Sequence, residues 1–424
     1  MYLAINIVGL VVFLGIAILF SKNRSQIKWR SVAVMLVVNL VLGWFFTSFA
    51  LGRNMVLGAA SGFNELVSVA YKGISFAFAD WVNVPQMNFF TSVLLPFLLV
   101  VPLFDILTYV GILPLVIKWI GRILSKVTGQ PKFETFFSVE MMFLGNPEVL
   151  AVSSLQLKHM KAERNLTIAM MTMSCVTASV IGAYTKLMPG QFILTAVPIN
   201  VINALIITTI LNPVTVDPEE DTIATMKDDR IAQSNVDVEP EAELLAAGTA
   251  DKPTKVEREP FFSFLGDSIL YAGKLILIIA ANVIAFVALA ALVDKILMAI
   301  NPWFSLEHLL GIVMYPFAWL LGVHQDDVFQ LAQYMGTKLV TNEFVVMGDV
   351  TSKISHFNPH YRAVLTVFLT SFANLSTVGM IIGTFKGMVE RQKSDLIAKN
   401  AGYLLLSGIL VSLLSAAVVG LYVW

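Results

Sequence analysis

Long stretches without charged residues recur along the chain, and each is long enough to cross a lipid bilayer. A transmembrane helix needs about 20 mostly apolar residues. Seven runs carry no charge, at residues 2–20, 31–51, 165–185, 187–216, 275–293, 363–385 and 400–424. An eighth run, 88–117, carries only Asp105. We therefore predict eight spans, and we interpret the first as a retained helix because it lacks the basic region and cleavage site of a signal peptide.

Composition supports a polytopic membrane protein. Hydrophobic residues make up 57% of the 424 residues and charged residues 13%, whereas soluble domains are about 25% charged. The net charge of −1 argues against a nucleic-acid partner, and the single Cys175 excludes a disulfide framework or a multi-cysteine metal site. P-loop, zinc-protease and serine-elbow motifs are absent. We therefore predict no enzyme activity, cofactor or metal.

The distribution of basic residues predicts how the chain is oriented in the cell membrane, either an inner or a plasma membrane. Lys and Arg concentrate in alternate connecting segments, at residues 22–30, 118–132, 158–164 and 386–399. Such segments face the cytoplasm, so both termini are predicted to lie outside. Residues 217–260 hold 13 acidic and 5 basic residues, a composition typical of a disordered linker, here on the cytoplasmic side.

Two further segments are apolar but too polar or too broken to span. They are residues 133–157 and 309–352, with Gly145-Asn146-Pro147-Glu148 and Thr341-Asn342-Glu343-Phe344 near their centres. Gly and Pro interrupt helices, and exposed backbone inside a membrane survives only against protein or a water-filled cavity. We interpret both segments as re-entrant helical hairpins.

Matching motifs in and after the two hairpins are separated by similar distances along the sequence. Glu148 and Glu343 are 195 positions apart, and the Ile-Gly pairs that end at Gly182 and Gly383, in the spans that follow, are 201 apart. Similar offsets indicate an internal duplication. An odd number of predicted crossings separates the copies, which predicts an inverted repeat of the kind that secondary transporters use.

Polar residues inside the predicted membrane region mark candidate sites. A carboxylate there is costly and suggests function, so Glu148 and Glu343 come first; the alternative is that each caps a broken helix or pairs with a lysine such as Lys338. Asn374 and Thr377 are three apart, on one face of an expected helix, and either bind a solute or bond neighbouring helices.

Two other charges in apolar surroundings have a structural interpretation. Asp105 lies in a span outside both copies, and we expect a structural or gating role for it. Lys274 precedes the run 275–293, and its long side chain is expected to reach the membrane surface.

These motifs resemble those of the concentrative nucleoside transporters, specifically the bacterial nucleoside permeases, over essentially the whole chain. The motifs are Gly145-Asn146-Pro147-Glu148, Thr341-Asn342-Glu343-Phe344-Val345 and Ser371-Phe372-Ala373-Asn374-Leu375-Ser376-Thr377. The resemblance implies an all-α polytopic membrane protein with eight transmembrane helices, two re-entrant hairpins in an inverted repeat, and interfacial helices. It also implies a homotrimer whose transport domain moves like an elevator against a scaffold.

The resemblance divides the chain into five parts. Residues 1–117 form N-terminal scaffold helices, 118–216 the first transport repeat, 217–260 the linker, 261–300 a scaffold span and 301–424 the second transport repeat. It also implies which residues bind the nucleoside. The base side is assigned Asn146, Pro147, Glu148 and Val180, and the ribose side is assigned Glu343, Phe372, Asn374 and Thr377.

The chain departs from the family at two places. Many members carry Gln and a hydroxyl residue where this chain has Asn146 and Pro147, and the surrounding sequence is similar to permeases of the purine nucleoside type. Sodium-coupled members have Asn and Ser where Met141 and Cys175 stand here. Sulfur ligands suit a hard cation poorly.

The sulfur side chains predict proton coupling in place of sodium coupling, with Glu148 or Glu343 as proton carrier, and the resemblance implies import of purine nucleosides. The alternative is an exchanger or facilitator for another polar solute on the same scaffold.

Overall fold

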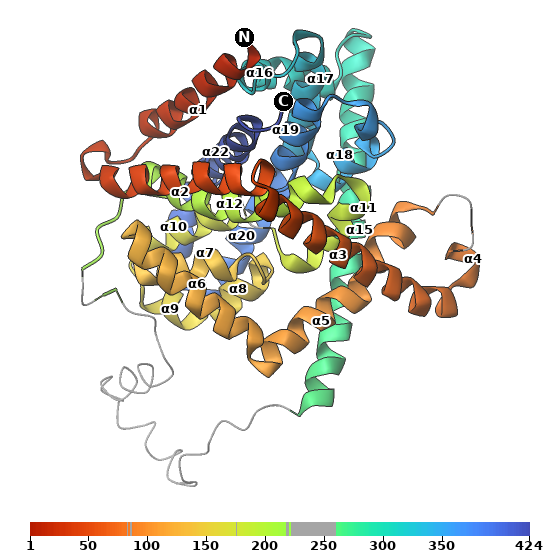
Figure 1. The fold of residues 1–424 in the computed structure, drawn as a ribbon, viewed down its shortest axis with the longest axis horizontal. Helices are drawn as coiled ribbons and strands as arrows, with labels where there is room; N and C mark the ends of the chain where they lie inside the picture. Colours follow the sequence, from red (N-terminus) through yellow and green to blue (C-terminus); the bar gives the residue numbers. More distant parts are fainter. Residues whose placement is uncertain (83, 85–86, 175, 218–219, 222–259) are drawn as a thin grey trace.

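The chain forms an all-helical bundle over the part that the structure describes. The computed structural model describes residues 1–424 except 83, 85–86, 175, 218–219 and 222–259, and it leaves out the side chains of 147, 148, 151 and 179. The linker expected at 217–260 therefore lies almost wholly outside the described residues. Among the described residues there are helices and no strands (Figure 1).

The N-terminal part contributes six helices. They are α1 (Tyr2–Leu19), α2 (Trp29–Thr47), α3 (Ala50–Ala77), α4 (Ala79–Val82), α5 (Phe97–Val110) and α6 (Ile112–Thr128). A π-helical turn at Phe90–Leu94 leads into α5, so that Phe90–Val110 forms one apolar unit of 21 residues. The left-handed conformation of Gly111, with φ of 92°, turns the chain sharply from α5 into α6.

From α6 onward, the described helices other than α15 follow one order twice. The first copy is α6, then α7 (Lys132–Glu140), α8 (Asn146–Val152) and α9 (Ser154–His159), then α10 (Ala162–Thr172), α11 (Ala178–Leu187) and α12 (Gly190–Leu211). The second copy is α16 (Leu306–Leu320), then α17 (Val328–Val340) and α18 (Glu343–Val350), then α19 (Pro359–Leu369), α20 (Leu375–Met388), α21 (Arg391–Lys399) and α22 (Ala401–Gly420). Each copy has a leading helix, a hairpin, a pair of half-helices and a long helix, which agrees with the predicted duplication.

Two of the eight predicted spans are each divided into two half-helices. Six described helices are long and apolar enough to cross a membrane. The runs 165–185 and 363–385, expected as continuous spans, instead contain α10 with α11 and α19 with α20. Hydropathy sums side chains and is insensitive to where the backbone leaves the helix, so the breaks had no hydropathy signal.

The second hairpin is shorter than the segment 309–352 that was predicted for it. Residues up to Leu320 belong to α16, a separate helix that packs along α17, and only α17 and α18 form the hairpin. The turn at Gly322, with φ of 72°, brings the backbone within reach of Tyr2 and Asn6 of α1. A side chain at this glycine would clash with that backbone, so the end of α16 is fixed against the N-terminal helix.

The long helices α12 and α22 cross in the centre of the molecule and are mostly buried. Their contact is partly polar: Asn203 donates to the Ser415 hydroxyl at 2.9 Å and accepts from the Asn39 amide of α2 at 2.6 Å. Interhelical bonds of this kind fix the relative position of helices in a membrane. The two copies are thereby joined through their last helices.

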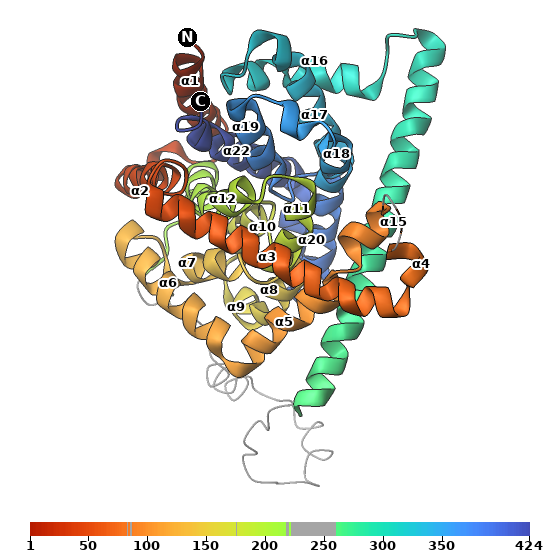
Figure 2. The same cartoon turned by 45° about the vertical axis from the view of Figure 1, so that its right-hand side comes forward.

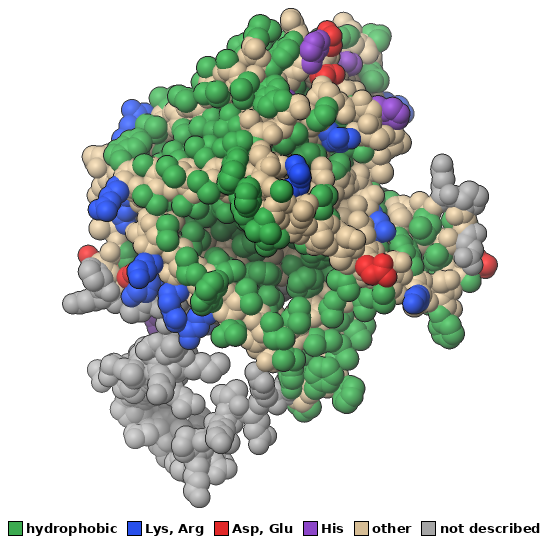
Figure 3. All heavy atoms as spheres, viewed as in Figure 1, with side chains coloured by type: hydrophobic (Ala, Val, Ile, Leu, Met, Phe, Trp, Pro, Cys, Tyr) green, Lys and Arg blue, Asp and Glu red, His purple; other side chains and the backbone are tan. Residues whose placement is uncertain are grey.

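The helix α15 (Phe261–Ile300) is placed differently, at the edge of the molecule (Figure 2). It has 40 residues and packs mainly against α5, where the Ser268 hydroxyl bonds the Asp105 carboxylate. Most of its apolar side chains are exposed in the single chain. The face drawn in Figure 3 is largely apolar, with several Lys and Arg side chains along its left edge and others scattered over it, as expected for a membrane protein.

Candidate functional site

A cavity of about 560 Å³ lies where both hairpin tips, both pairs of half-helices and α15 come together. Ligand pockets for small molecules are typically about 300–1,000 Å³, so the cavity has room for one small solute. Its lining includes all the residues with described side chains that the family resemblance assigns to nucleoside binding: Asn146, Val180, Glu343, Phe372, Asn374 and Thr377. These residues lie up to 231 positions apart in the sequence.

The tip of the second hairpin places Glu343 at the start of α18. Asn342 caps this helix, since its side chain accepts a hydrogen bond from the Val345 amide at 3.1 Å. The Glu343 side chain is 2% exposed and is held by two donors. Its Oε1 accepts from the Tyr184 hydroxyl at 2.9 Å and its Oε2 from the Asn374 amide at 3.2 Å. Asn342, and not Glu343, is therefore the cap of α18.

The break between α19 and α20 places Asn374 as the cap of α20. Its side-chain oxygen accepts from the Thr377 backbone amide at 2.9 Å and from the Thr377 hydroxyl at 3.0 Å, while its amide donates to Glu343. Asn374 is therefore in extended backbone, and the prediction of one shared helix face for Asn374 and Thr377 was wrong. The two residues still meet, because a cap brings its side chain onto the first turn.

The tip of the first hairpin presents Asn146 to the same cavity. Asn146 is 2% exposed, and neither its amide nitrogen nor its oxygen has a hydrogen-bond partner among the described residues. A buried polar group without a partner is costly, and here both atoms belong to a residue that lines a cavity. The backbone of Pro147 and Glu148 belongs to α8, but their side chains lie outside the described residues.

One of the two positions expected for a degenerate sodium site, Met141, lines a second, much smaller cavity of about 10 Å³ beside the α10–α11 break. Met141 lines it together with Ser174 and Asn200, while Cys175 lies outside the described residues. The Asn200 oxygen is buried without a partner in the described part of the chain, and its amide donates to the Thr370 carbonyl at 2.5 Å. Sequence reasoning missed Asn200, because the only signal for it in the sequence is a polar residue within an apolar run.

The wall of the large cavity opposite the hairpins belongs to α15. Tyr271, Lys274 and Asn282 line it, at a spacing that places them along one face of a helix. Lys274 therefore lines the cavity while it remains exposed, and its reach toward the membrane surface stays a prediction. The signal was available in the sequence as polar residues recurring at helical spacing.

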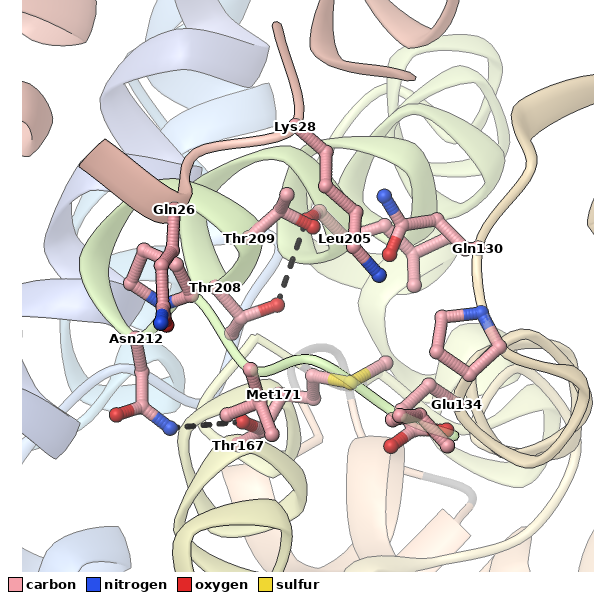
Figure 4. A pocket seen from close by; sticks show the side chains of 14 residues that line it. Gln26, Lys28, Gln130, Glu134, Thr167, Met171, Leu205, Thr208, Thr209 and Asn212 are labelled. Carbon is pink, nitrogen blue, oxygen red and sulfur yellow. Dashed lines mark hydrogen bonds between the residues drawn. The ribbon is translucent and has the colours of Figure 1, made fainter. Parts of the chain in front are cut away.

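A third cavity, of about 30 Å³, lies at the other end of α10 and α12 and is lined by Gln26, Glu134, Thr167 and Asn212 among others (Figure 4). Its polar groups are largely occupied by the protein itself. Asn212 donates to the Thr167 hydroxyl at 2.9 Å. This cavity is too small for an organic solute.

Glu134, which borders this third cavity, is engaged in an ion pair. Its two carboxylate oxygens each accept from Arg164 at 2.8 Å, and both side chains are almost fully buried. Such a bidentate pair has its bonding capacity largely used. We therefore assign this region a structural role.

Two family models match the chain. The model described as the C-terminus of the Na+ dependent nucleoside transporter covers residues 192–420, and the model of its N-terminus covers residues 8–81. Among curated proteins, the chain is 41% identical to the purine nucleoside transport protein NupG of Bacillus subtilis, over all of both chains. It is 26% identical to the nucleoside permease NupC of Helicobacter pylori, over 99% of this chain and 97% of that one.

Solved structures share the fold. A structure of CNTnw in an inward-facing substrate-bound state matches with a TM-score of 0.87 at 22% identity, covering 100% of this chain and 98% of that one. A CNTnw variant in an outward-facing state matches with a TM-score of 0.86 at 21% identity and the same coverage. The family consists of transporters, so the protein is a transporter and not an enzyme. The chain belongs to the concentrative nucleoside transporter family and is a multi-pass membrane transporter of nucleosides.

Proposed function

We propose that the protein is a secondary active importer that binds a purine nucleoside between its two hairpin tips. The observation that carries the proposal is that two kinds of polar group line one cavity: Asn146 offers an unpartnered amide, and Glu343 with Asn374 forms a hydrogen-bonded acid–amide pair. A carboxylate accepts bonds from hydroxyls, and an amide pairs with a base edge as donor and acceptor. The ribose is therefore assigned to Glu343 and the base to Asn146.

The purine preference is supported by the first hairpin and by the 41% identical relative whose name includes purine nucleosides. Pro147 has no hydrogen-bonding side chain, so Asn146 must supply the contacts that two polar side chains would otherwise share. Val180 and Phe372 provide apolar surface on the cavity wall for the faces of the base and sugar. A Glu148 contact to the base completes the proposed site.

Proton coupling is proposed in place of sodium coupling, although the matching family models are described as Na+ dependent. At the expected sodium positions this chain has Met141, whose thioether is buried, and Cys175. Hard cations prefer oxygen ligands, so sulfur at two positions weakens a sodium site. Glu148 and Glu343 are the proposed proton carriers.

The proposed transport cycle moves the two repeats, residues 118–216 and 301–424, like an elevator against a scaffold of 1–117 and 261–300. The edge position of α15 supports this division, since its exposed apolar side chains need lipid or another subunit to cover them. A homotrimer assembled through the scaffold would provide such a cover. Both termini would lie outside the cell membrane and residues 217–260 in the cytoplasm, following the distribution of basic residues.

Uptake into proteoliposomes tests the proposal. A panel of nucleosides, free bases and sugars is offered under an imposed proton gradient and, separately, under a sodium gradient at constant pH. We expect purine nucleosides to accumulate under the proton gradient and nucleosides alone to compete. Accumulation driven only by sodium would refute proton coupling, and exchange without gradient-driven accumulation would favour a facilitator or exchanger.

The site assignment has its own control. Glu343→Gln keeps the size of the side chain but removes the charge, and we expect affinity for the nucleoside to fall about 10- to 100-fold because bonds to a charged group are the strong ones. A folded variant that transports at the parent rate would contradict the ribose assignment.

A further inference from the structure

Lys338 is a fully buried lysine in the middle of the second transport repeat. It lies in the last turn of α17, five positions before Glu343, and is 0% exposed. An ammonium group buried without compensation is very unfavourable. The groups that surround Lys338 must therefore account for its presence.

The Lys338 ammonium binds the place where α19 ends. Its Nζ donates to the Phe368 carbonyl and to the Ser371 hydroxyl, both at 2.6 Å, and it lies 4.6 Å from the centre of the Phe368 ring. Ser371 in turn shares a hydrogen bond of 2.6 Å with Ser412 of α22. The lysine thus joins the first limb of the hairpin to the break between α19 and α20.

This is a position that suits a positive charge. The carbonyl end of a helix carries a partial negative charge. In transporters with broken helices, freed carbonyls at the ends of half-helices coordinate the coupling cation. In the second repeat, carbonyl and hydroxyl oxygens at such an end are already bound by a covalently attached ammonium.

The corresponding break in the first repeat is built differently. Beside the end of α10, the described lining of the small cavity consists of Met141, Met142, Ser174 and Asn200 with four apolar residues, and includes no basic side chain. The Asn200 oxygen there is unpartnered among the described residues. The two breaks therefore differ in whether the protein supplies its own cation.

We propose that Lys338 is a tethered cation that takes the place of an ion in the second repeat and acts as a positioning residue. It fixes Phe368 and Ser371, and through the following turn it orders Asn374 against Glu343. The second repeat then needs no ion from solution, and only the first repeat is left to respond to a coupling ion. The link to nucleoside binding rests on the proposed function.

The test is chemical rescue of Lys338→Ala, which leaves space for a small cation. Nucleoside affinity is measured by calorimetry on purified full-length protein in detergent, in choline chloride and then in ammonium or methylammonium chloride. In choline chloride we expect affinity at least about tenfold below the parent, since bonds to a charged group are lost. Ammonium should restore most of it. Choline is too large to enter.

A matched control is Lys353→Ala, which removes an exposed lysine just beyond the same hairpin, where it pairs with the exposed Asp349. Its affinity should match the parent in every salt. Lys338→Met keeps the volume without the charge, and Lys338→Arg keeps the charge. Parental affinity in a folded Lys338→Ala or Lys338→Met variant would overturn the proposal, as would a loss that no small cation reverses.

One readout is independent of nucleoside binding. The melting temperature of Lys338→Ala should rise with ammonium chloride and stay unchanged with choline chloride, while the parent responds equally to both. If the parent binds no nucleoside but this difference is present, the proposed function fails and the tethered cation stands. If Lys338→Ala does not fold, Lys338→Met and Lys338→Arg decide, with Arg expected to retain more affinity than Met.

Discussion

The Tyr184 hydroxyl of α11 donates a 2.9 Å hydrogen bond to Oε1 of Glu343 on α18. The two residues are 159 positions apart and belong to different repeats. Both are almost fully buried, and the Tyr184 ring also packs edge-on against Phe344 at 5.1 Å. One copy of the duplicated unit therefore helps to hold the acidic group of the other.

Tyr184→Phe tests this contact. The ring and its packing remain, but Glu343 loses one of its two side-chain donors, so we expect nucleoside affinity to fall about tenfold. Tyr71→Phe is the control, because the Tyr71 hydroxyl bonds the Ser92 carbonyl away from the cavity. Calorimetry on both purified variants measures the change. Equal affinity in the two variants would mean that Tyr184 does not organise the site.

Asn146→Ala should reduce discrimination between bases. Its amide is the unpartnered donor and acceptor at the first tip, so its loss removes contacts that distinguish one base edge from another. We expect the ranking of nucleosides in a competition assay to flatten, with purine affinity lower by about tenfold. Asn282→Ala removes an amide from the α15 wall of the same cavity and should keep the ranking. An unchanged ranking in Asn146→Ala would place the base elsewhere.

Lys274→Met tests whether the wall formed by α15 contacts the solute. Lys274 lines the cavity and is exposed within it, so its contribution is expected to be small, with a rise in KM of about two- to fivefold. Lys295→Met, which removes an exposed lysine further along α15, should leave KM unchanged. If both variants behave like the parent, Lys274 faces only water during transport.

The buried ion pair between Arg164 and Glu134 should contribute more to the stability of the protein than an exposed ion pair does. Arg164→Met leaves a buried carboxylate without its two 2.8 Å partners, which typically costs about 3–5 kcal/mol. The melting temperature of the purified variant should fall clearly. Lys161→Met breaks an exposed 2.8 Å ion pair with Glu220 and should leave the melting temperature unchanged. Equal melting temperatures for the two variants would contradict the expectation that the buried ion pair contributes more than the exposed one.

Sequence reasoning selected residues that one cavity brings together, but it missed the backbone breaks around them, and their part in binding stays a prediction. Glu343 and Asn374 were identifiable because polar groups in apolar runs are costly, and the cavity brings them together. The breaks that position them were hidden, since the residues on either side of each break are as apolar as those of a continuous helix. Asn374 before a helical turn that contains Thr377 is a capping pattern, and that local signal was available.

Other contacts depend on tertiary structure that no local pattern specifies. Lys338 was considered as a partner for Glu343, but its hydrogen bonds go to Phe368 and Ser371, 30 and 33 positions away. Asn200 bonds a carbonyl 170 positions away. Pairings over such distances are set by how the two copies pack together, which a single sequence does not encode in any short motif.

The length of α15 has a consequence for the lipid environment. Its 40 residues make a helix of about 60 Å, twice the hydrocarbon core of about 30 Å. Only its charge-free stretch, residues 275–293 and about 28 Å long, has to match that core, and a thinner or thicker bilayer changes the tilt of the helix. Because the same helix forms a wall of the solute cavity, its tilt also sets the shape of that wall. The acyl-chain length of the surrounding lipid thus becomes a variable that acts on the cavity from outside the protein.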